Sequence, residues 1–270
     1  MEKTTRKPAH RAAAPHQRSA PVRRRMPSSR DVLASSEMSA GFRSPKEDRV
    51  RVIPLGGVEE VGRNMTIVEY KDDIILIDAG LQFPEEATPG IDYIIPNTKY
   101  LQGKLNKIRG LIISHGHLDH VGGIPYLMKD IGNPPIYTTG ITAAMIMKRQ
   151  EEFPHAPKLK IIEVKSQEKI KIGKHLSAKF FTIAHTIPDA IGIVLETPLG
   201  NVVYPGDFKI DRDEKGIPMH TEEYAKIGKE KNLLLLLEST NSEEPGFSIS
   251  EREARNNLKK DDEIIASVME

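Results

Sequence analysis

His115-Gly116-His117-Leu118-Asp119-His120 is the stretch of this sequence that decides the fold. Three imidazoles and a carboxylate lie within six residues, directly after the apolar run 111–114, which predicts a buried strand. On a strand-to-helix turn these side chains can all point into one space, and Gly116 lets the backbone turn tightly. Imidazole and carboxylate are ligands that suit zinc where thiolates are absent. The hexapeptide therefore predicts a metal centre, and a His-rich surface loop is the less favoured interpretation.

The composition limits what else can bind a metal or do chemistry. The chain has 270 residues and no Cys, which excludes disulfides, thiolate zinc fingers, iron–sulfur clusters and a cysteine nucleophile. Its 38% hydrophobic residues are enough for a sizeable core, but no apolar run approaches the length of a membrane span. No apolar segment follows the basic N-terminus, so no secretory signal is expected. We expect a cytoplasmic protein with no membrane contact.

Two further candidate ligands lie downstream, each after an expected strand. His185 follows residues 178–183, and Asp207 follows residues 201–204. Each alone is a weak signal, because a lone His is usually structural and Gly-Asp is a common turn. Together with the hexapeptide they can complete a two-metal site in which Asp207 bridges the metals.

The pattern of apolar residues from Arg49 onward predicts an α/β fold. Short β-branched runs alternate with Gly, Asp and Pro turns, which is typical of successive strands. The expected strands are 50–55, 65–70, 74–78, 111–114, 136–138, 161–164, 170–172, 178–183, 191–196, 201–204 and a fully buried 233–237, with a hairpin turn at 71–73. Helices are expected at about 120–129, 142–152 and 221–230. Two sheets with helices outside, an αββα sandwich, fit this order.

The charge is distributed unevenly. Residues 1–30 carry nine basic side chains and one acidic, a net of +8, and the remaining 30 basic and 37 acidic residues give a net of −7. The segment before Phe42 has no helical or strand period and little apolar surface, so we expect residues 1–47 to be disordered. A basic arm gains affinity for nucleic acid by releasing counterions from phosphates. A solvated tail or an organelle transit peptide is the alternative interpretation.

Several motifs resemble one family. The hexapeptide matches the HxHxDH signature of the metallo-β-lactamase superfamily, and other stretches resemble its ribonuclease J family, of the β-CASP branch: GGVEEVGRN at 56–64, DAG at 78–80, GIDYIIP at 90–96 and PGDFK at 205–209. The resemblance runs from about Arg49 to Ala254. It implies a metallo-β-lactamase αββα sandwich over residues 48–245. It also implies a cytoplasmic zinc-dependent exo- or endoribonuclease that acts in rRNA processing and mRNA decay.

The resemblance assigns a role to each candidate residue. His115, His117 and His185 would hold one zinc, Asp119 and His120 the second, and Asp207 would bridge both. A water activated by the two ions would then hydrolyse the RNA phosphodiester. Asp119 and Glu238 are the candidate catalytic residues. Glu238 resembles the family acid that pairs with a later His to protonate the leaving group. Asp78 either orients a ligand or is a simple turn residue.

The C-terminal part departs from the family pattern. Residues 248–253 resemble the entry to a β-CASP domain, so 246–270 are expected to be its start. No His occurs after His220, so the later histidines of the family have no counterpart here and the second zinc lacks one protein ligand. We expect a ribonuclease J cut short, with exposed apolar surfaces and RNA cleavage that is weak or absent at low metal concentration.

Two other hypotheses stay open. The chain can be a stand-alone metallo-hydrolase of the same fold that acts on thioesters or lactones, or a non-catalytic RNA-binding fragment. Two metals with RNA cleavage support the nuclease, ester turnover supports the small-molecule enzyme, and binding without turnover supports the fragment. The sequence also leaves a homo-oligomer open.

Overall fold

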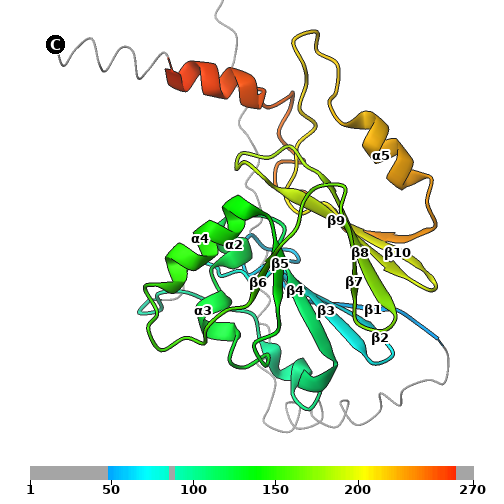
Figure 1. The fold of residues 1–270 in the computed structure, drawn as a ribbon. Coiled ribbons are helices and arrows are strands. Elements are labelled where there is room, and N and C mark those ends of the chain that lie inside the picture. Colours follow the sequence, from blue (N-terminus) through cyan, green and yellow to red (C-terminus); the bar gives the residue numbers. More distant parts are fainter. Residues whose placement is uncertain (1–47, 85–88, 260–270) are drawn as a thin grey trace, which may run out of the picture. The chain divides into compact units, whose positions relative to one another are not determined.

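Two β-sheets form the centre of the part of the chain that a computed structural model describes, residues 48–84 and 89–259 (Figure 1). The first sheet has six strands, in the order β1 (Arg51–Gly56), β2 (Met65–Tyr70), β3 (Asp73–Ile77), β4 (Ile108–Ile112), β5 (Ile136–Thr138) and β6 (Ile161–Glu163). The second has five, in the order β11 (Asn232–Leu235), β10 (Gly200–Tyr204), β9 (Ile191–Thr197), β8 (Leu176–Thr182) and β7 (Lys169–Ile172). The expected disordered arm, residues 1–47, lies outside the described residues.

Helices cover the outer face of each sheet. The helices α2 (Leu118–Val121), α3 (Ile124–Leu127) and α4 (Gly140–Gln150) pack on the first sheet, and α5 (Thr221–Gly228) packs on the second (Figure 1). Short 3-10 turns, η2 (Thr98–Leu101) and η3 (Leu105–Lys107), precede β4. This is the expected αββα sandwich, and the α/β fold class is confirmed.

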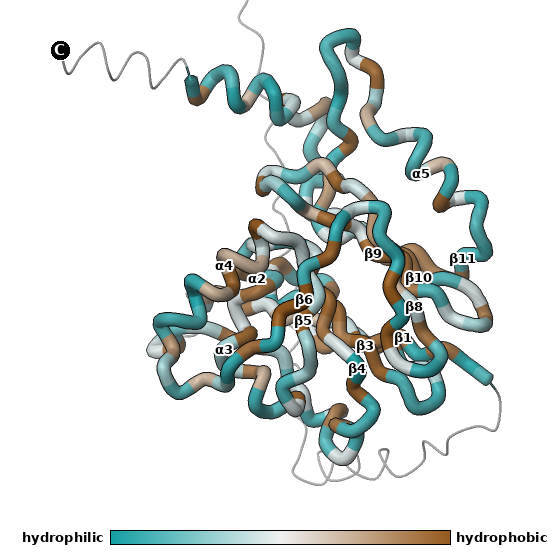
Figure 2. Tube along the Cα trace, viewed as in Figure 1, coloured by the Kyte–Doolittle hydropathy of each residue, from teal (hydrophilic) through white to brown (hydrophobic). Residues whose placement is uncertain are grey.

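Alternating side chains on the central strands produce the layers. Along β3, Ile74 and Leu76 belong to the cluster under the helices, whereas Ile75 and Ile77 belong to the cluster between the sheets. Successive side chains of a strand point to opposite faces, so a strand that is apolar throughout is buried on both. Figure 2 shows brown, hydrophobic stretches along these central strands.

The helix expected over 120–129 is wrong: the structure has two four-residue helices, α2 and α3, separated by Gly122 and Gly123. Gly123 donates its N–H to the carbonyl of Ala79 at 2.8 Å. A Cβ at Gly123 would lie 2.6 Å from the carbonyl oxygen of Gly80. The helix is interrupted at Gly122 and Gly123 because the backbone that follows β3, at Ala79 and Gly80, packs against Gly123. Glycine is also a poor helix former.

The prediction that residues 233–237 form a fully buried strand is also wrong. The strand β11 is exposed, with Leu233 at 49%, Leu235 at 53% and the following Leu237 at 56% of their full accessibility. It lies at the sheet edge and pairs, in parallel, with β10. The apolar composition of this run indicates only what the strand could bury. It does not report whether a partner covers it. The exposed leucines of β11 agree with the expectation that this chain has uncovered apolar surface.

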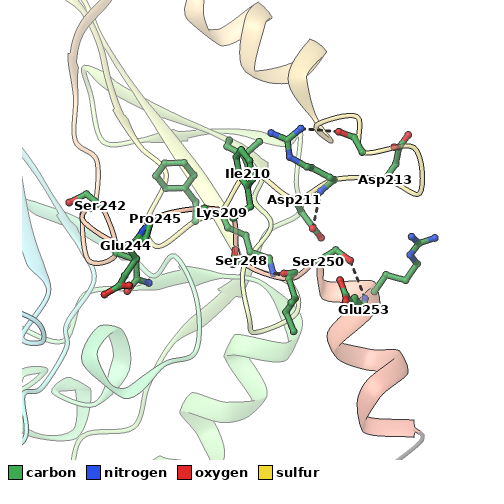
Figure 3. A pocket seen from close by; sticks show the side chains of 18 of the residues that line it. Lys209, Ile210, Asp211, Asp213, Ser242, Glu244, Pro245, Ser248, Ser250 and Glu253 are labelled. Carbon is green, nitrogen blue, oxygen red and sulfur yellow. Dashed lines mark hydrogen bonds between the residues drawn. The ribbon is translucent and has the colours of Figure 1, made fainter. Parts of the chain in front are cut away.

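The C-terminal segment is described as far as residue 259. Residues 251–259 are helical, and residues 238–253 enclose a pocket of about 930 Å³ with the segment after β10 (Figure 3). Whether residues 246–270 begin a β-CASP domain stays a prediction. In residues 48–84 and 89–259 no helix has the length and apolar character needed to cross a membrane.

Candidate metal centre

The six predicted metal ligands lie together where strands of both sheets end. His115 and His117 follow β4, and Asp119 and His120 lie in α2. From the second sheet, His185 follows β8 and Asp207 follows β10. We call His115, His117, His185 and Asp207 the first cluster, and Asp119, His120 and Asp207 the second cluster. The ligand atoms of each cluster lie within 4.8 Å of one another, and Asp207 belongs to both.

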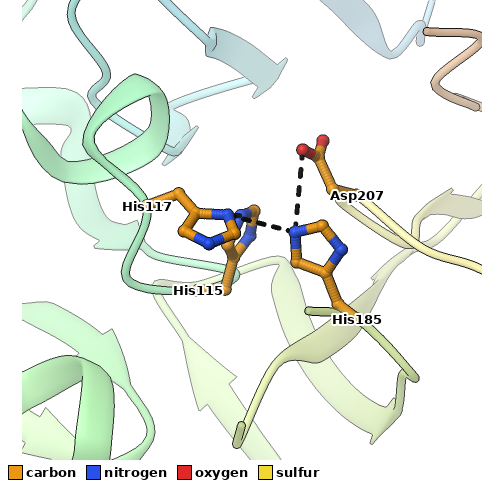
Figure 4. Close-up of side chains that lie close together, drawn as sticks. All are labelled: His115, His117, His185 and Asp207. Carbon is orange, nitrogen blue, oxygen red and sulfur yellow. Dashed lines mark hydrogen bonds and ion pairs between the residues drawn. The ribbon is translucent and has the colours of Figure 1, made fainter. Parts of the chain in front are cut away.

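The spacing of the first cluster fits a shared cation (Figure 4). Nδ1 of His117 lies 3.1 Å from Nε2 of His115 and 3.1 Å from Nε2 of His185. A ring nitrogen carries either one proton or one lone pair, so His117 cannot form a hydrogen bond with both neighbours. Two imidazole nitrogens bound to one tetrahedral zinc at about 2.0–2.1 Å are roughly 3.3 Å apart. The donor set and its spacing therefore suit a divalent metal.

Protonation in the first cluster also favours a metal. Burial, together with the charges of the nearby His120 and His185, lowers the pKa of His115 to about 2. Burial lowers the pKa of His185 as well. Burial raises the pKa of Asp207, but the hydrogen bond from His120 and the charges of the imidazoles outweigh it and hold the pKa at about 2. At neutral pH His115 and His185 are thus neutral and Asp207 is ionised, which are the forms that bind metal.

The second cluster is built around the buried His120. Its Nδ1 lies 2.8 Å from Oδ2 of Asp78, and its Nε2 lies 3.4 Å from Asp119 and 3.3 Å from Asp207. Burial lowers the pKa of His120, but the three carboxylates raise it well above its ordinary value. An imidazole surrounded by three carboxylates requires a positive charge, which either a second proton or a metal at Nε2 supplies.

Asp78 holds His120 in place. Its buried carboxylate accepts hydrogen bonds from the backbone N–H of Ser114 at 2.8 Å, from the Ser114 hydroxyl at 3.0 Å and from the Tyr204 hydroxyl at 2.7 Å. Because an ionised carboxylate only accepts, the proton of His120 lies on Nδ1, and Nε2 faces the second cluster. Of the two interpretations left open for Asp78, these contacts favour the one in which it orients a ligand.

Sequence reasoning missed Tyr204 and the role of Asn64. Burial, followed by the charge of Asp78, raises the pKa of Tyr204 well above its ordinary value, so its hydroxyl stays protonated and donates to Asp78. The amide of Asn64 lies 3.3 Å from the Asp119 carboxylate and 3.1 Å from Nε2 of His120. Asn64 ends the quoted GGVEEVGRN motif, which was a usable signal. Tyr204 only appeared as the last residue of an expected strand.

Glu238 lies outside both clusters. It lines a hollow of about 840 Å³ together with His185 and Asp207, and Lys209 and Arg255 line the same hollow. Its carboxylate accepts a hydrogen bond from the backbone N–H of Thr240 at 2.8 Å. The structure thus places this candidate catalytic residue beside the metal centre, without contact to a ligand atom.

Known proteins resemble this chain in sequence and in fold. Residues 58–225 match the family model of the metallo-beta-lactamase superfamily. Ribonuclease J of Thermus thermophilus is 38% identical over 228 residues, which are 82% of this chain and 39% of that protein. Ribonuclease J 1 of Streptococcus pyogenes is 40% identical over 209 residues, covering 77% of this chain and 37% of that protein. Ribonuclease J2 of Bacillus subtilis is 36% identical over 205 residues, covering 76% of this chain and 37% of that protein.

The chain spans less than two fifths of the length of these relatives. Among solved structures, a protein of unknown function from Enterococcus faecalis V583 has a TM-score of 0.56 at 20% identity, covering 74% of this chain and 52% of that chain. This likeness supports the fold alone.

Proposed function

This chain belongs to the metallo-β-lactamase superfamily and, within it, to the ribonuclease J family, and from this premise we propose that it carries the metal centre of a zinc-dependent ribonuclease. The observation that carries the proposal is the pair of ligand clusters that share Asp207. The names of the relatives support RNA as the substrate over a small ester or lactone. A cytoplasmic location is part of the same proposal.

In this proposal the first cluster would hold one zinc and the second cluster another, and Asp207 would serve both because it belongs to both clusters. Bound zinc supplies Lewis acidity and a water of lowered pKa. Asp78 keeps the proton on Nδ1 of His120 and so directs the Nε2 lone pair into the site. We assign Asp119, a carboxylate of the second cluster, as the group that would accept the proton released by the attacking water. Glu238, which lines the adjoining hollow, would act beside the leaving oxygen, where the family acid it resembles pairs with a proton donor.

The proposal is tested with the 270-residue chain, loaded with zinc and incubated with a labelled single-stranded RNA. We expect cleavage that rises with zinc concentration and disappears in His115→Ala. A thioester and a lactone are assayed in parallel. Turnover of either without RNA cleavage would replace the nuclease with a small-molecule hydrolase. RNA binding without turnover at saturating zinc would favour a non-catalytic fragment.

The two clusters are expected to lose zinc at different pH. Zinc in the second cluster must displace a proton from His120, whose raised pKa makes that proton a strong competitor. As pH falls, the affinity of this cluster should drop by roughly tenfold per unit, since one proton is exchanged for one metal. His115 and His185 have lowered pKa values and offer far less competition. In a titration from about pH 8 to about pH 5, followed by zinc release to a chromogenic chelator, one zinc per chain should leave first. Simultaneous loss of both would contradict this assignment.

The basic arm is proposed to contribute affinity for RNA and no chemistry. Deleting residues 1–47 should weaken RNA binding and flatten its salt dependence, by about 0.7 in log–log slope for each lost single-strand phosphate contact. A full-length variant with Arg23, Arg24 and Arg25 changed to Gln serves as the matched control, because it removes charge without shortening the chain. Binding isotherms at several salt concentrations give the slope. An unchanged slope in both variants would show that the arm does not touch RNA.

A further inference from the structure

The loop that carries His185 is tied to the start of α4 by two reciprocal hydrogen bonds. The hydroxyl of Thr139, which is 1% exposed, donates to the backbone carbonyl of Asp189 at 2.8 Å. In return, Oδ2 of Asp189 accepts from the backbone N–H of Ile141, in the first turn of α4, at 3.3 Å. Asp189 adopts a left-handed backbone conformation with φ of +66°, which Asp tolerates better than most residues.

This arrangement differs from an ordinary helix cap. Thr139 is the residue at the N-cap of α4, where a threonine side chain usually accepts a hydrogen bond from a free N–H of the first turn. Thr139 makes no such bond: its hydroxyl donates outward to Asp189 and lies 3.3 Å from the hydroxyl of Thr142. Asp189 supplies the missing acceptor from another part of the chain. The cap of α4 is therefore shared between two segments that lie 50 residues apart.

The shared cap joins the two halves of the first cluster. The helix α4 follows β5 of the first sheet, and Asp189 lies between β8 and β9 of the second sheet. Close by, the backbone N–H of Ile191 donates to the carbonyl of Ser114 at 3.0 Å, directly before His115. His115 and His117 come from the first sheet and His185 from the second. The separation of their ring nitrogens therefore depends on how the His185 loop is held against the first sheet.

We propose that Thr139 and Asp189 are positioning residues for His185, which set the metal affinity and geometry of the first cluster. The inference rests on the proposed function, since it presumes that the first cluster binds a metal. We expect Thr139 to contribute more than Asp189 to the positioning of His185. The hydrogen bond from the Thr139 hydroxyl is short and buried, whereas the Asp189 carboxylate is exposed and its hydrogen bond is longer. The second cluster depends less on this tie, because Asp78 anchors His120 separately.

Four variants of the full chain test the proposal. Thr139→Val removes the hydroxyl and keeps a side chain of similar size, whereas Thr139→Ser keeps the hydroxyl. Asp189→Ala removes the carboxylate acceptor, and Asp189→Asn keeps an oxygen that can accept. The readouts are the visible absorption spectrum of bound Co²⁺, which reports ligand geometry, and the metal affinity from competition with a chelator. Groups that orient metal ligands through hydrogen bonds typically contribute 10–100-fold to affinity. We expect about a tenfold loss with an altered spectrum for Thr139→Val, a smaller loss for Asp189→Ala, and values close to the unmodified chain for the Ser and Asn variants.

Thr197→Val is the matched control. The Thr197 hydroxyl donates to the carbonyl of Gly200 at 2.6 Å in the β9–β10 hairpin, at the opposite end of these strands from the metal centre. The Thr197→Val variant should lower the stability of the fold without changing the spectrum of bound Co²⁺. An unchanged affinity and spectrum in both Thr139→Val and Asp189→Ala would overturn the positioning role, and so would an equal change in Thr197→Val. If the unmodified chain bound no Co²⁺, the metal centre itself would fail. Because Asp189 is exposed, its variants keep the test decisive even if Thr139→Val does not fold.

Discussion

Asp207→Ala is expected to remove both metals and to abolish RNA hydrolysis, whereas His120→Ala should retain about one zinc per chain. The two carboxylate oxygens of Asp207 face different clusters. Oδ1 lies 3.3 Å from Nε2 of His120, and Oδ2 lies 3.9 Å from Nε2 of His185. Loss of this carboxylate removes a ligand from both clusters and leaves two cations close together without a shared anion. His120 contributes to the second cluster alone.

Zinc per chain, measured by elemental analysis after dialysis, checks this prediction. Asp213→Ala is the matched control, because it removes a carboxylate from the same connecting segment, six residues away and outside both clusters. Asp213 accepts hydrogen bonds from the backbone of Lys215 and Ile217, so its loss affects a local turn. Equal zinc retention in Asp207→Ala and His120→Ala would exclude the bridging role of Asp207.

The parts of the fold that could be predicted are those in which local sequence and tertiary environment agree. The strands β2 and β5 have the predicted bounds, and Lys71 and Asp72 form the turn between β2 and β3. Continuous apolar runs correctly indicated central strands because these strands are covered on both faces. The same rule failed for β11, which lies at an edge and is exposed.

The candidate site was predictable where its ligands form a contiguous motif. The hexapeptide at 115–120 carries four of the six ligands, and His185 and Asp207 were found because each follows a strand. Supporting residues gave no comparable signal. Tyr204 supports Asp78 from 126 residues away, and Thr139 contacts Asp189 from the other sheet. Such contacts depend on the packing of one sheet on the other, which spacing along the chain does not encode.

Asp78→Asn is expected to weaken zinc binding by the second cluster, because Asp78 determines which nitrogen of His120 carries the proton. Asn keeps the shape of Asp78, but its amide group can donate to Nδ1 of His120 and so favour the tautomer with the proton on Nε2. That proton would occupy the lone pair that faces Asp119 and Asp207. We expect the second cluster to lose about 10–100-fold in zinc affinity while the first cluster keeps its metal. Asp78→Ala should in addition destabilise the fold by about 3–5 kcal/mol, because Ser114, Tyr204 and His120 lose a buried partner.

The other end of β3 provides a control for this prediction. Asp73 is also fully buried; its carboxylate accepts from Nε of Arg109 at 2.6 Å and from the backbone N–H groups of Lys174 and His175, both at 2.6 Å. Asp73→Ala should therefore lower the free energy of unfolding by an amount similar to Asp78→Ala, yet leave zinc affinity unchanged in the protein that remains folded. Chemical denaturation gives the stability, and chelator competition gives the affinity of each cluster. If Asp78→Asn kept full affinity in the second cluster, the Asp78 carboxylate would not control which nitrogen of His120 carries the proton. Its four hydrogen-bond contacts would then serve the packing of β3, β4 and β10 around it.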